Sequence, residues 1–102
     1  MRFQLRFYTV RRGALDDFVR EWTEHVRPLR LAHGFSVLGP WVVEDENAFV
    51  WIVGHDGDFD AADAAYYASP QRKALDPDPV RHLDEVRTWF MRAPAQMPAR
   101  DR

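Results

Sequence analysis

AFVWIVGH, residues 48–55, is the stretch that decides the fold. It is a short apolar run between two groups of turn residues, DEN at 45–47 and DGD at 56–58, which is typical of a β-strand. Its two alternating rows are Phe49, Trp51 and Val53 on one side and Val50 and Ile52 on the other. A strand that is apolar on both faces belongs in the middle of a sheet and needs cover on both sides.

Three more strands surround it in the sequence. Residues 2–10 alternate, with Phe3, Leu5 and Phe7 on one face and Arg2, Gln4, Arg6 and Tyr8 on the other. Residues 35–44 form a second strand, in which Gly39-Pro40 predicts a bulge or an edge position because proline cannot donate to a ladder. Residues 82–92 form the last strand.

Helices separate these strands. The first follows the RRG turn at 11–13 and runs to His33. Gly34 follows as the C′ residue that ends the helix. Its apolar positions recur with a period of 3.6 and are Leu15, Phe18, Val19, Trp22, Val26 and Leu29. Pro28 lacks an N–H and crowds the carbonyl of Glu24, so we expect a bend near His25. A second helix covers 59–68 with Asp58 as N-cap, and a shorter piece covers 71–75.

The element order β-α-β-β-α-β predicts an α+β, ferredoxin-like fold with an antiparallel four-stranded sheet in the order 4-1-3-2. We expect one domain over 1–92, followed by an extended proline-rich tail over 93–102. Two helices cover one face of such a sheet. The uncovered apolar row therefore predicts a homodimer in which two sheets pack face to face, the alternative being that a loop covers this row.

Composition excludes several classes of partner. The net charge of −2 is mixed along the chain, which argues against a nucleic-acid partner. The absence of cysteine excludes disulfides and thiolate chemistry. No signal peptide and no apolar run of the ~18 residues that a membrane span needs is visible, so we expect no membrane partner and a cytoplasmic location.

Histidines are the first candidates for chemistry, because imidazole transfers protons near neutral pH. His25 lies beside the apolar stripe of the first helix, and His55 ends the central strand on the Trp51 face. We expect these two as catalytic bases and Tyr66 as a hydroxyl that holds an enolate oxygen. The pocket would be completed by Trp22, Trp51 and Phe18, or these aromatics could be ordinary core.

The polar row of the first strand leaves two interpretations. Arg6 and Tyr8 could line the pocket, with Arg6 binding a carboxylate or phenolate, or the row could bond across the dimer interface, which we favour. His33 is expected to belong to the helix stop and His82 to the surface. The DGDFD run at 56–60 departs from a calcium loop at Ala61 and Tyr67, so no metal is expected.

The stretch 8–71 resembles the NIPSNAP family of the dimeric α+β barrel superfamily, and the resemblance extends from Phe3 to Arg92. It is carried by W-x-x-H-x-x-P-L-R-x-x-H-G-F at 22–35, by the F-V-W strand and by the Y-x-S-P step at 67–70. The resemblance implies a barrel of two ferredoxin-like chains with a pocket between sheet and helices, and it implies no reaction. Neighbouring families include cofactor-free monooxygenases, cyclases, isomerases and haem proteins.

Three functions follow as hypotheses. The first is a bacterial biosynthetic enzyme, cofactor-independent, that acts on an aromatic or polyketide-like metabolite as a cyclase, isomerase or monooxygenase. The second is a non-catalytic binding or interaction protein of the NIPSNAP type. The third is a haem protein that uses His25 or His55 as ligand. A deep pocket with a convergent imidazole would favour the first, and a pocket filled by Trp22 and Trp51 the second.

Overall fold

The sheet has the order expected from the sequence. The structure is a computed structural model that describes residues 1–94. Its four strands are β1 (Arg2–Val10), β2 (Ser36–Val43), β3 (Ala48–His55) and β4 (Leu83–Met91). They pair antiparallel in the order β2-β3-β1-β4. The predicted α+β, ferredoxin-like class and the strand order 4-1-3-2 are confirmed.

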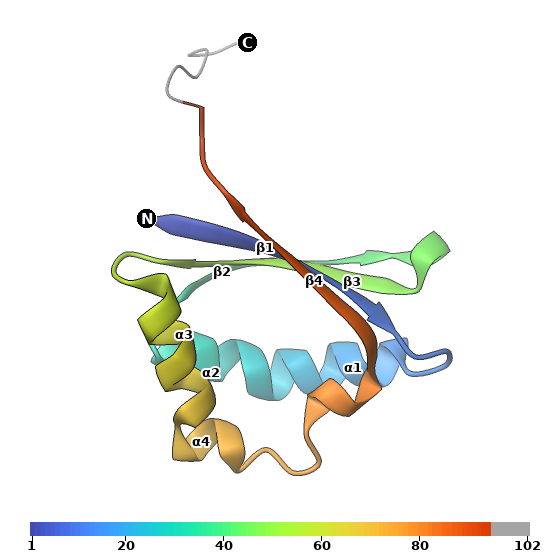
Figure 1. Cartoon of the computed structure of the whole chain (residues 1–102). Coiled ribbons are helices and arrows are strands. Elements are labelled where there is room, and N and C mark those ends of the chain that lie inside the picture. The colour runs from blue at the N-terminus through green and yellow to red at the C-terminus, as the bar shows by residue number, and fades with distance from the viewer. Residues whose placement is uncertain (95–102) are drawn as a thin grey trace.

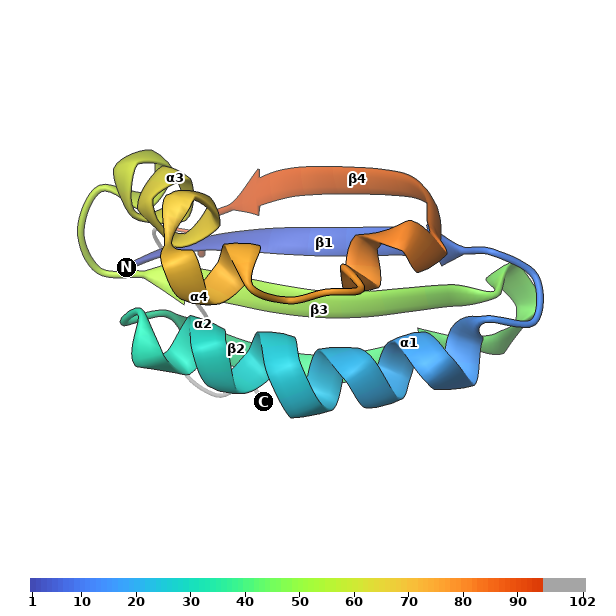
Figure 2. The same ribbon diagram turned by 90° about the horizontal axis from the view of Figure 1, so that it is seen from below.

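Apart from the turn at 44–46 in the β2–β3 hairpin, the helical segments lie on one side of this sheet, as Figures 1 and 2 show. The first helical region consists of α1 (Leu15–Glu21), a π-helical segment η1 (Trp22–Val26) and α2 (Arg27–Ala32). The second consists of α3 (Phe59–Ala68) and the short α4 (Pro70–Lys73). Two 3₁₀ turns complete the chain, η2 (Glu44–Glu46) and η3 (Pro79–His82). None of the helices within residues 1–94 is long and apolar enough to cross a membrane.

The predicted bend near His25 takes the form of the π-helical segment. The Arg27 N–H donates to the Trp22 carbonyl, five residues earlier, directly before Pro28. A wider turn relieves the crowding that the proline ring imposes on the preceding turn. It also takes up more residues per turn, so side chains spaced by four stay on one face. The buried residues of this helical region accordingly follow a spacing of four, at Phe18, Trp22, Val26 and Arg30.

The helix ends use the expected caps. Gly34 has φ +87°, and the Phe35 N–H donates to the Arg30 carbonyl while the Gly34 N–H donates to the Leu31 carbonyl. This is a Schellman stop, in which glycine takes the left-handed position without strain. At the start of α3, the Asp58 carboxylate accepts from the Ala61 N–H, as an N-cap should.

The β2–β3 hairpin confirms the effect of Gly39-Pro40. The register shifts between Leu38 and Trp41, and β2 is an edge strand. The turn closes at Asn47, which has φ 47° and donates its side-chain amide to the Val10 carbonyl at 2.7 Å. Asparagine tolerates this left-handed backbone because its side chain bonds locally.

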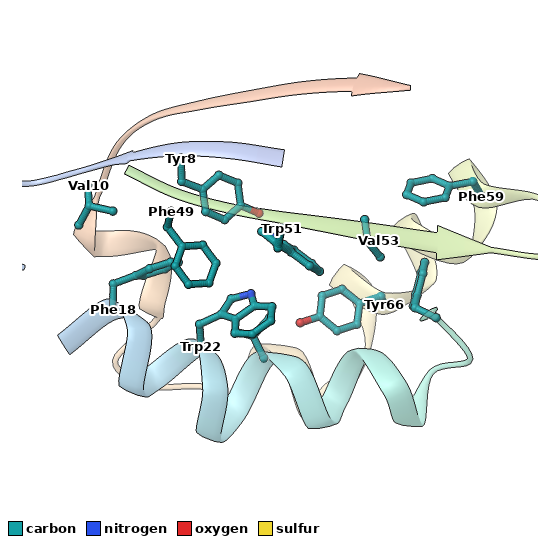
Figure 3. Packing of buried hydrophobic residues seen from close by; sticks show 11 residues of the cluster. Tyr8, Val10, Phe18, Trp22, Phe49, Trp51, Val53, Phe59 and Tyr66 are labelled. Carbon is teal, nitrogen blue, oxygen red and sulfur yellow. The ribbon is translucent and has the colours of Figure 1, made fainter. Parts of the chain in front are cut away.

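The core lies between the sheet and the helices and is built mainly from aromatic rings (Figure 3). The Trp51 face of β3 is the buried one, and Trp51 packs edge-to-face against Trp22 with ring centroids 5.2 Å apart. Phe59 and Tyr66 form the inner side of α3, as its sequence predicts. Aromatic pairs in this geometry add attraction beyond the area that they bury.

The opposite sheet face is mainly apolar, and no helix of residues 1–94 covers it. One row joins Leu38, Ile52, Leu5 and Trp89, and the next joins Trp41, Val50, Phe7 and Arg87. We call these two rows the open sheet face. Leu38, Trp41 and Trp89 are each about half exposed. No loop within residues 1–94 forms the second layer that the alternative interpretation required.

Two predictions about polar residues are wrong. Gln4, Arg6 and Tyr8 lie on the buried side under the helices, and not on the open sheet face as the favoured interpretation had them. His82 is not in a strand or on the surface, because it ends η3 and is half-buried against Glu21. The proline-rich tail prediction for 93–102 falls almost wholly outside the described residues.

Candidate functional site

A small cavity lies between the sheet and the helices, among the aromatic residues expected there. It measures about 30 Å³. Its lining comes from β1, β3, the first helical region, α3, α4 and η3, and comprises Tyr8, Phe18, Trp22, Val26, Arg30, Trp51, Tyr66, Tyr67, Arg72, Pro79, Val80 and Leu83. A cavity needs ~10–15 Å³ for each water molecule, so this one accommodates about two. Phe18, Trp22, Trp51, Tyr66 and Tyr8 lie together around this cavity, and that they bind a substrate stays a prediction.

Several hydrogen-bond donors of the residues around this cavity have no partner among residues 1–94. The Trp22 and Trp51 indole nitrogens and the Tyr66 hydroxyl are buried and have no hydrogen-bond partner within residues 1–94. Figure 3 shows the Tyr66 hydroxyl directed toward the Trp22 ring, and the Trp22 indole nitrogen on the edge of its ring that faces the sheet. Burial raises the pKa of the Tyr66 phenol, so this group remains a neutral hydroxyl that can donate. Buried polar groups normally have partners, so these three groups require an acceptor within the cavity, which water or a ligand can supply.

Arg30 brings a positive charge to the wall of the cavity. Its side chain is 1% exposed and donates to the Asp63 carboxylate at 2.7 Å and to the Tyr67 hydroxyl at 3.3 Å. The guanidinium carbon lies 3.8 Å from the centre of the Tyr66 ring. Stacking on an aromatic face and a charged hydrogen bond are the means by which a protein holds a guanidinium away from water.

Arg6 lies behind this cluster on β1. It donates to the Gln4 side chain at 2.7 Å and to the Tyr67 hydroxyl at 3.1 Å, and it reaches Asp63 at 3.4 Å. Burial lowers the pKa of Arg6, but its interactions with Tyr8, Tyr67 and Asp63 outweigh burial and raise it further above its ordinary value. Arg6 is therefore permanently charged, and it is not among the residues that line the cavity.

The cavity adjoins an open groove at α4 and η3. Three of its lining residues, Tyr67, Arg72 and Val80, also line a groove of about 440 Å³ that adds Lys73 and Asp78. Arg72 donates to the Asp78 carboxylate at 3.0 Å across this boundary. Burial raises the pKa of Asp78, but its hydrogen bonds with Arg72 and the Val80 N–H dominate and lower it, so the pair stays ionised. These residues form the route between cavity and solvent.

His25 is not at the cavity. It lies on the solvent side of η1, about half exposed, beside a separate open groove of about 340 Å³ that Glu21, Glu24 and Asp76 also line. The π-helical turn places Trp22 and Val26 inward and His25 outward. The prediction that His25 shares a pocket with Trp22 is therefore wrong.

His55 is not at the cavity either. Its Nδ1 accepts from the Gly57 N–H at 2.9 Å, and its ring lies 5.1 Å from the Phe35 ring at the end of β3. His33 is part of the helix stop, as expected, and donates through Nδ1 to the Leu29 carbonyl. No imidazole lines the cavity within residues 1–94, so the structure lends no support to a histidine base there.

The sequence interpretation missed Arg30, Asp63 and Tyr67. A charged residue on the predicted core helix reads as solvent-facing when an unbroken period of 3.6 is assumed. The spacing of four through Phe18, Trp22 and Val26 to Arg30 was the available signal. Asp63 and Tyr67 are also separated by four, so they stand on one side of α3, turned toward Arg30.

The residues do not fit a haem or a metal ion. The 30 Å³ cavity offers neither histidine nor space for a macrocycle, and His25 stands over a polar, acidic groove. The His55 Nδ1 is occupied by a backbone donor. Within residues 1–94 no three His, Asp or Glu side chains are grouped as metal ligands.

Comparisons with known proteins identify structures that share this fold. No protein-family model matches the sequence, and no curated protein matches it either. Among solved structures, an uncharacterized NIPSNAP domain protein from Burkholderia xenovorans is 21% identical with a TM-score of 0.81, covering 96% of this chain and 99% of its own. A NIPSNAP family protein from Agrobacterium tumefaciens is 13% identical with a TM-score of 0.84, covering 97% and 98%.

An antibiotic biosynthesis monooxygenase has the same fold, with 17% identity, a TM-score of 0.67 and coverage of 91% of this chain and 98% of its own. The class that these likenesses define is the ferredoxin-like α+β fold of the NIPSNAP and antibiotic biosynthesis monooxygenase structures. The resemblance to NIPSNAP proteins that the sequence suggested is confirmed at the level of the fold. At these identities the fold does not carry a reaction with it.

Proposed function

We propose that this protein binds a small planar molecule in the aromatic cavity between the sheet and the helices. The observation that carries the proposal is the set of unpartnered donors, Trp22 Nε1, Trp51 Nε1 and Tyr66 OH, around one space. Apolar walls with a few convergent polar groups are the usual make-up of a ligand site. The cavity must widen to admit a ring, and Tyr67 and Val80, both about half exposed at the mouth, are the side chains that can give way.

Binding without histidine catalysis is favoured over the enzyme with a histidine base. No imidazole lines the cavity within residues 1–94. A general base must reach the proton that it removes, and His25 and His55 lie elsewhere.

A cofactor-independent enzyme is the second candidate. Fixed donors in a site without bulk water stabilise negative charge that develops on an enolate or phenolate oxygen. The fold shared with an antibiotic biosynthesis monooxygenase agrees with this chemistry. Such an enzyme would take hydroxylated aromatic or polyketide-like substrates that ionise readily, because the cavity lining supplies hydroxyl groups and no carboxylate.

Indole fluorescence tests the binding proposal, because Trp22 and Trp51 both touch the cavity. We expect phenol and 2-naphthol to change the emission in a saturable way. Tyr66→Phe keeps the ring and removes the donor, so it should weaken binding about 5- to 10-fold, the value of roughly one hydrogen bond. His25→Ala is the control and should bind as the wild type does. No saturable change with either compound would refute the proposal.

Oxygen uptake with 2-naphthol or a dihydroxynaphthalene then distinguishes enzyme from binder. Turnover that survives His25→Ala and His55→Ala but falls in Tyr66→Phe supports the donor-based enzyme. Turnover lost in the histidine variants with unchanged melting temperature would restore the histidine mechanism. Binding without turnover leaves the non-catalytic function.

We further propose that two chains pair through the open sheet face. Its two rows run across all four strands with Arg87 as their one charged member within the described residues, and Arg87 lies over the Phe7 ring at 4.8 Å. A contiguous exposed apolar surface of this kind is typical of an interface. The symmetric partner would then close a barrel of two sheets.

A further inference from the structure

The cavity and its surroundings carry more positive than negative charge. Arg6, Arg30 and Arg72 are all at least nine-tenths buried. The carboxylates that they contact are Asp63, which serves both Arg6 and Arg30, and Asp78, which serves Arg72. Three guanidinium groups thus face two carboxylates, and both carboxylates are more exposed to water than the arginines.

The arginines without a full set of hydrogen-bond partners are residues that line the cavity. The Nε atoms of Arg30 and Arg72 are buried without a hydrogen-bond partner among residues 1–94, and both residues line the cavity. The indole nitrogens of Trp22 and Trp51 are donors only, and the Tyr66 hydroxyl is the remaining orphan. These five groups all belong to residues that line the cavity, and four of them cannot accept a hydrogen bond.

A buried charge without compensation is costly, and removing one member of a buried ion pair shows this cost directly. A ligand with one negative charge and several acceptor oxygens would balance the excess positive charge and would also accept hydrogen bonds from the unpartnered donors. We propose that the ligand of this cavity is a planar aromatic carboxylate, bound with its ring among Trp22, Trp51 and Tyr66 and its carboxylate toward Arg30. This inference rests on the proposed binding function and adds the charge of the ligand.

The mouth of the cavity suits the same ligand. Lys73 and Arg72 stand in the outer groove next to a single carboxylate, Asp78. Cationic groups at the entrance of a narrow site concentrate anions and speed their arrival. Arginine also binds a carboxylate through two parallel hydrogen bonds, which orients a flat ligand as well as attracting it.

Benzoate and benzamide form the matched pair of probes, because they share shape and size and differ by the charge. We expect benzoate to bind at least 10-fold more tightly than benzamide, measured by indole fluorescence and by the rise in melting temperature. In Arg30→Gln, which keeps a polar side chain and removes the charge, the preference should fall to within about twofold. Arg20→Gln changes an exposed arginine away from the cavity and should keep the full preference.

The outcomes separate the two proposals. If phenol or benzamide binds and benzoate is no tighter, the binding function stands and the carboxylate inference is wrong. A preference that persists in Arg30→Gln also overturns it. If none of the compounds binds, both proposals fall. Should Arg30→Gln not fold, the wild-type ratio of benzoate to benzamide still decides, and Arg72→Gln provides the charge-removing variant.

Discussion

At the residue scale, Asp63 is the single carboxylate that two buried arginines share. It receives a short hydrogen bond from Arg30 and a longer one from Arg6, and the Tyr67 hydroxyl accepts from both arginines. The side chain of Asp63 is 24% exposed, whereas that of Arg30 is 1% exposed. Removing the aspartate therefore strands two buried positive charges, while removing Arg30 leaves Asp63 with Arg6 and water.

This asymmetry predicts unequal effects on stability. We expect Asp63→Asn to lower the free energy of unfolding by about 3 kcal/mol, the usual cost of stranding a buried charge. Arg30→Met keeps the length of the side chain and relieves the charge imbalance, so it should cost about 1 kcal/mol or less. Urea unfolding followed by indole fluorescence measures both.

The order of the two effects is the decisive result. If Arg30→Met proves more destabilising than Asp63→Asn, the cluster carries no uncompensated positive charge. A double variant Asp63→Asn/Arg30→Met should recover part of the Asp63→Asn loss, because it removes one stranded guanidinium. Asp60→Asn, an exposed aspartate on the same helix, is the matched control and should be nearly neutral.

At the element scale, α1 is tied to the segment before β4 through Glu21. The Glu21 carboxylate accepts two hydrogen bonds of 2.8 Å from Arg81 and one of 3.1 Å from the His82 Nε2. Hydrogen bonding from Arg81 is the main cause that lowers the pKa of Glu21 below its ordinary 4.5. The contact holds η3, and with it Pro79 and Val80, over the cavity.

The lowered pKa predicts an acid-dependent loss of stability. A carboxylate with a lowered folded-state pKa contributes its full stabilisation above the unfolded value, and loses it as pH falls through the folded value. At pH 7 we expect Glu21→Gln to be less stable than the wild type by roughly 1–2 kcal/mol, since charged hydrogen bonds are lost. This difference should begin to shrink as pH falls below the ordinary value of about 4.5 and continue to shrink as pH falls through the lowered folded-state pKa.

Unfolding curves from pH 7 to pH 3 test this dependence. Glu24→Gln, three residues further on and more exposed, should run parallel to the wild type. If the loss in free energy of unfolding caused by Glu21→Gln stays constant over this range, the contact depends on packing and not on the charge of Glu21.

The elements themselves were largely predictable from the sequence, because their signals are local. Asp58 and Gly34 mark helix ends by chemistry that acts within a few residues, and Gly39-Pro40 marks the edge strand in the same way. The inward direction of Arg30 was not predictable from the period alone, because the π-helical turn before Pro28 changes the phase of the helix. That phase change also turns His25 outward, so one local irregularity accounts for both errors.

The prediction that the polar row of β1 faces the dimer interface failed for a different reason. Alternation separates Arg6 and Tyr8 from Phe7, but it does not say which row faces the helices. The choice follows from partners of Arg6 on α3, Asp63 and Tyr67, that lie 57 and 61 residues further along the chain. Long-range pairing of this kind is not visible to a pattern read along one strand.

At the scale of the whole molecule, residues 1–94 cover the sheet on one face only. The row Leu38, Ile52, Leu5 and Trp89 crosses the open sheet face, and Phe7 and Val50 extend it toward the other end. Isolated exposed apolar residues are ordinary, but contiguous rows over four strands are not. We propose a second copy of the chain as the occupant, because it can match such a face with its own.

We therefore expect a mass of twice the 12.0 kDa chain in light scattering at micromolar concentration and ordinary salt. Leu5→Lys places an unpaired charge on a central strand of the proposed interface, once in each copy of the chain. It should weaken association at least 100-fold, about 3 kcal/mol, and give the mass of one chain. The lysine can extend to water in the separated chain, so the fold should survive, as circular dichroism will show.

Leu31→Lys, an exposed position on α2 remote from the sheet, should leave the mass unchanged. A wild-type mass of one chain would remove the second copy as the cover of this face, while the cavity on the other side of the sheet, built from one chain, would keep its own tests.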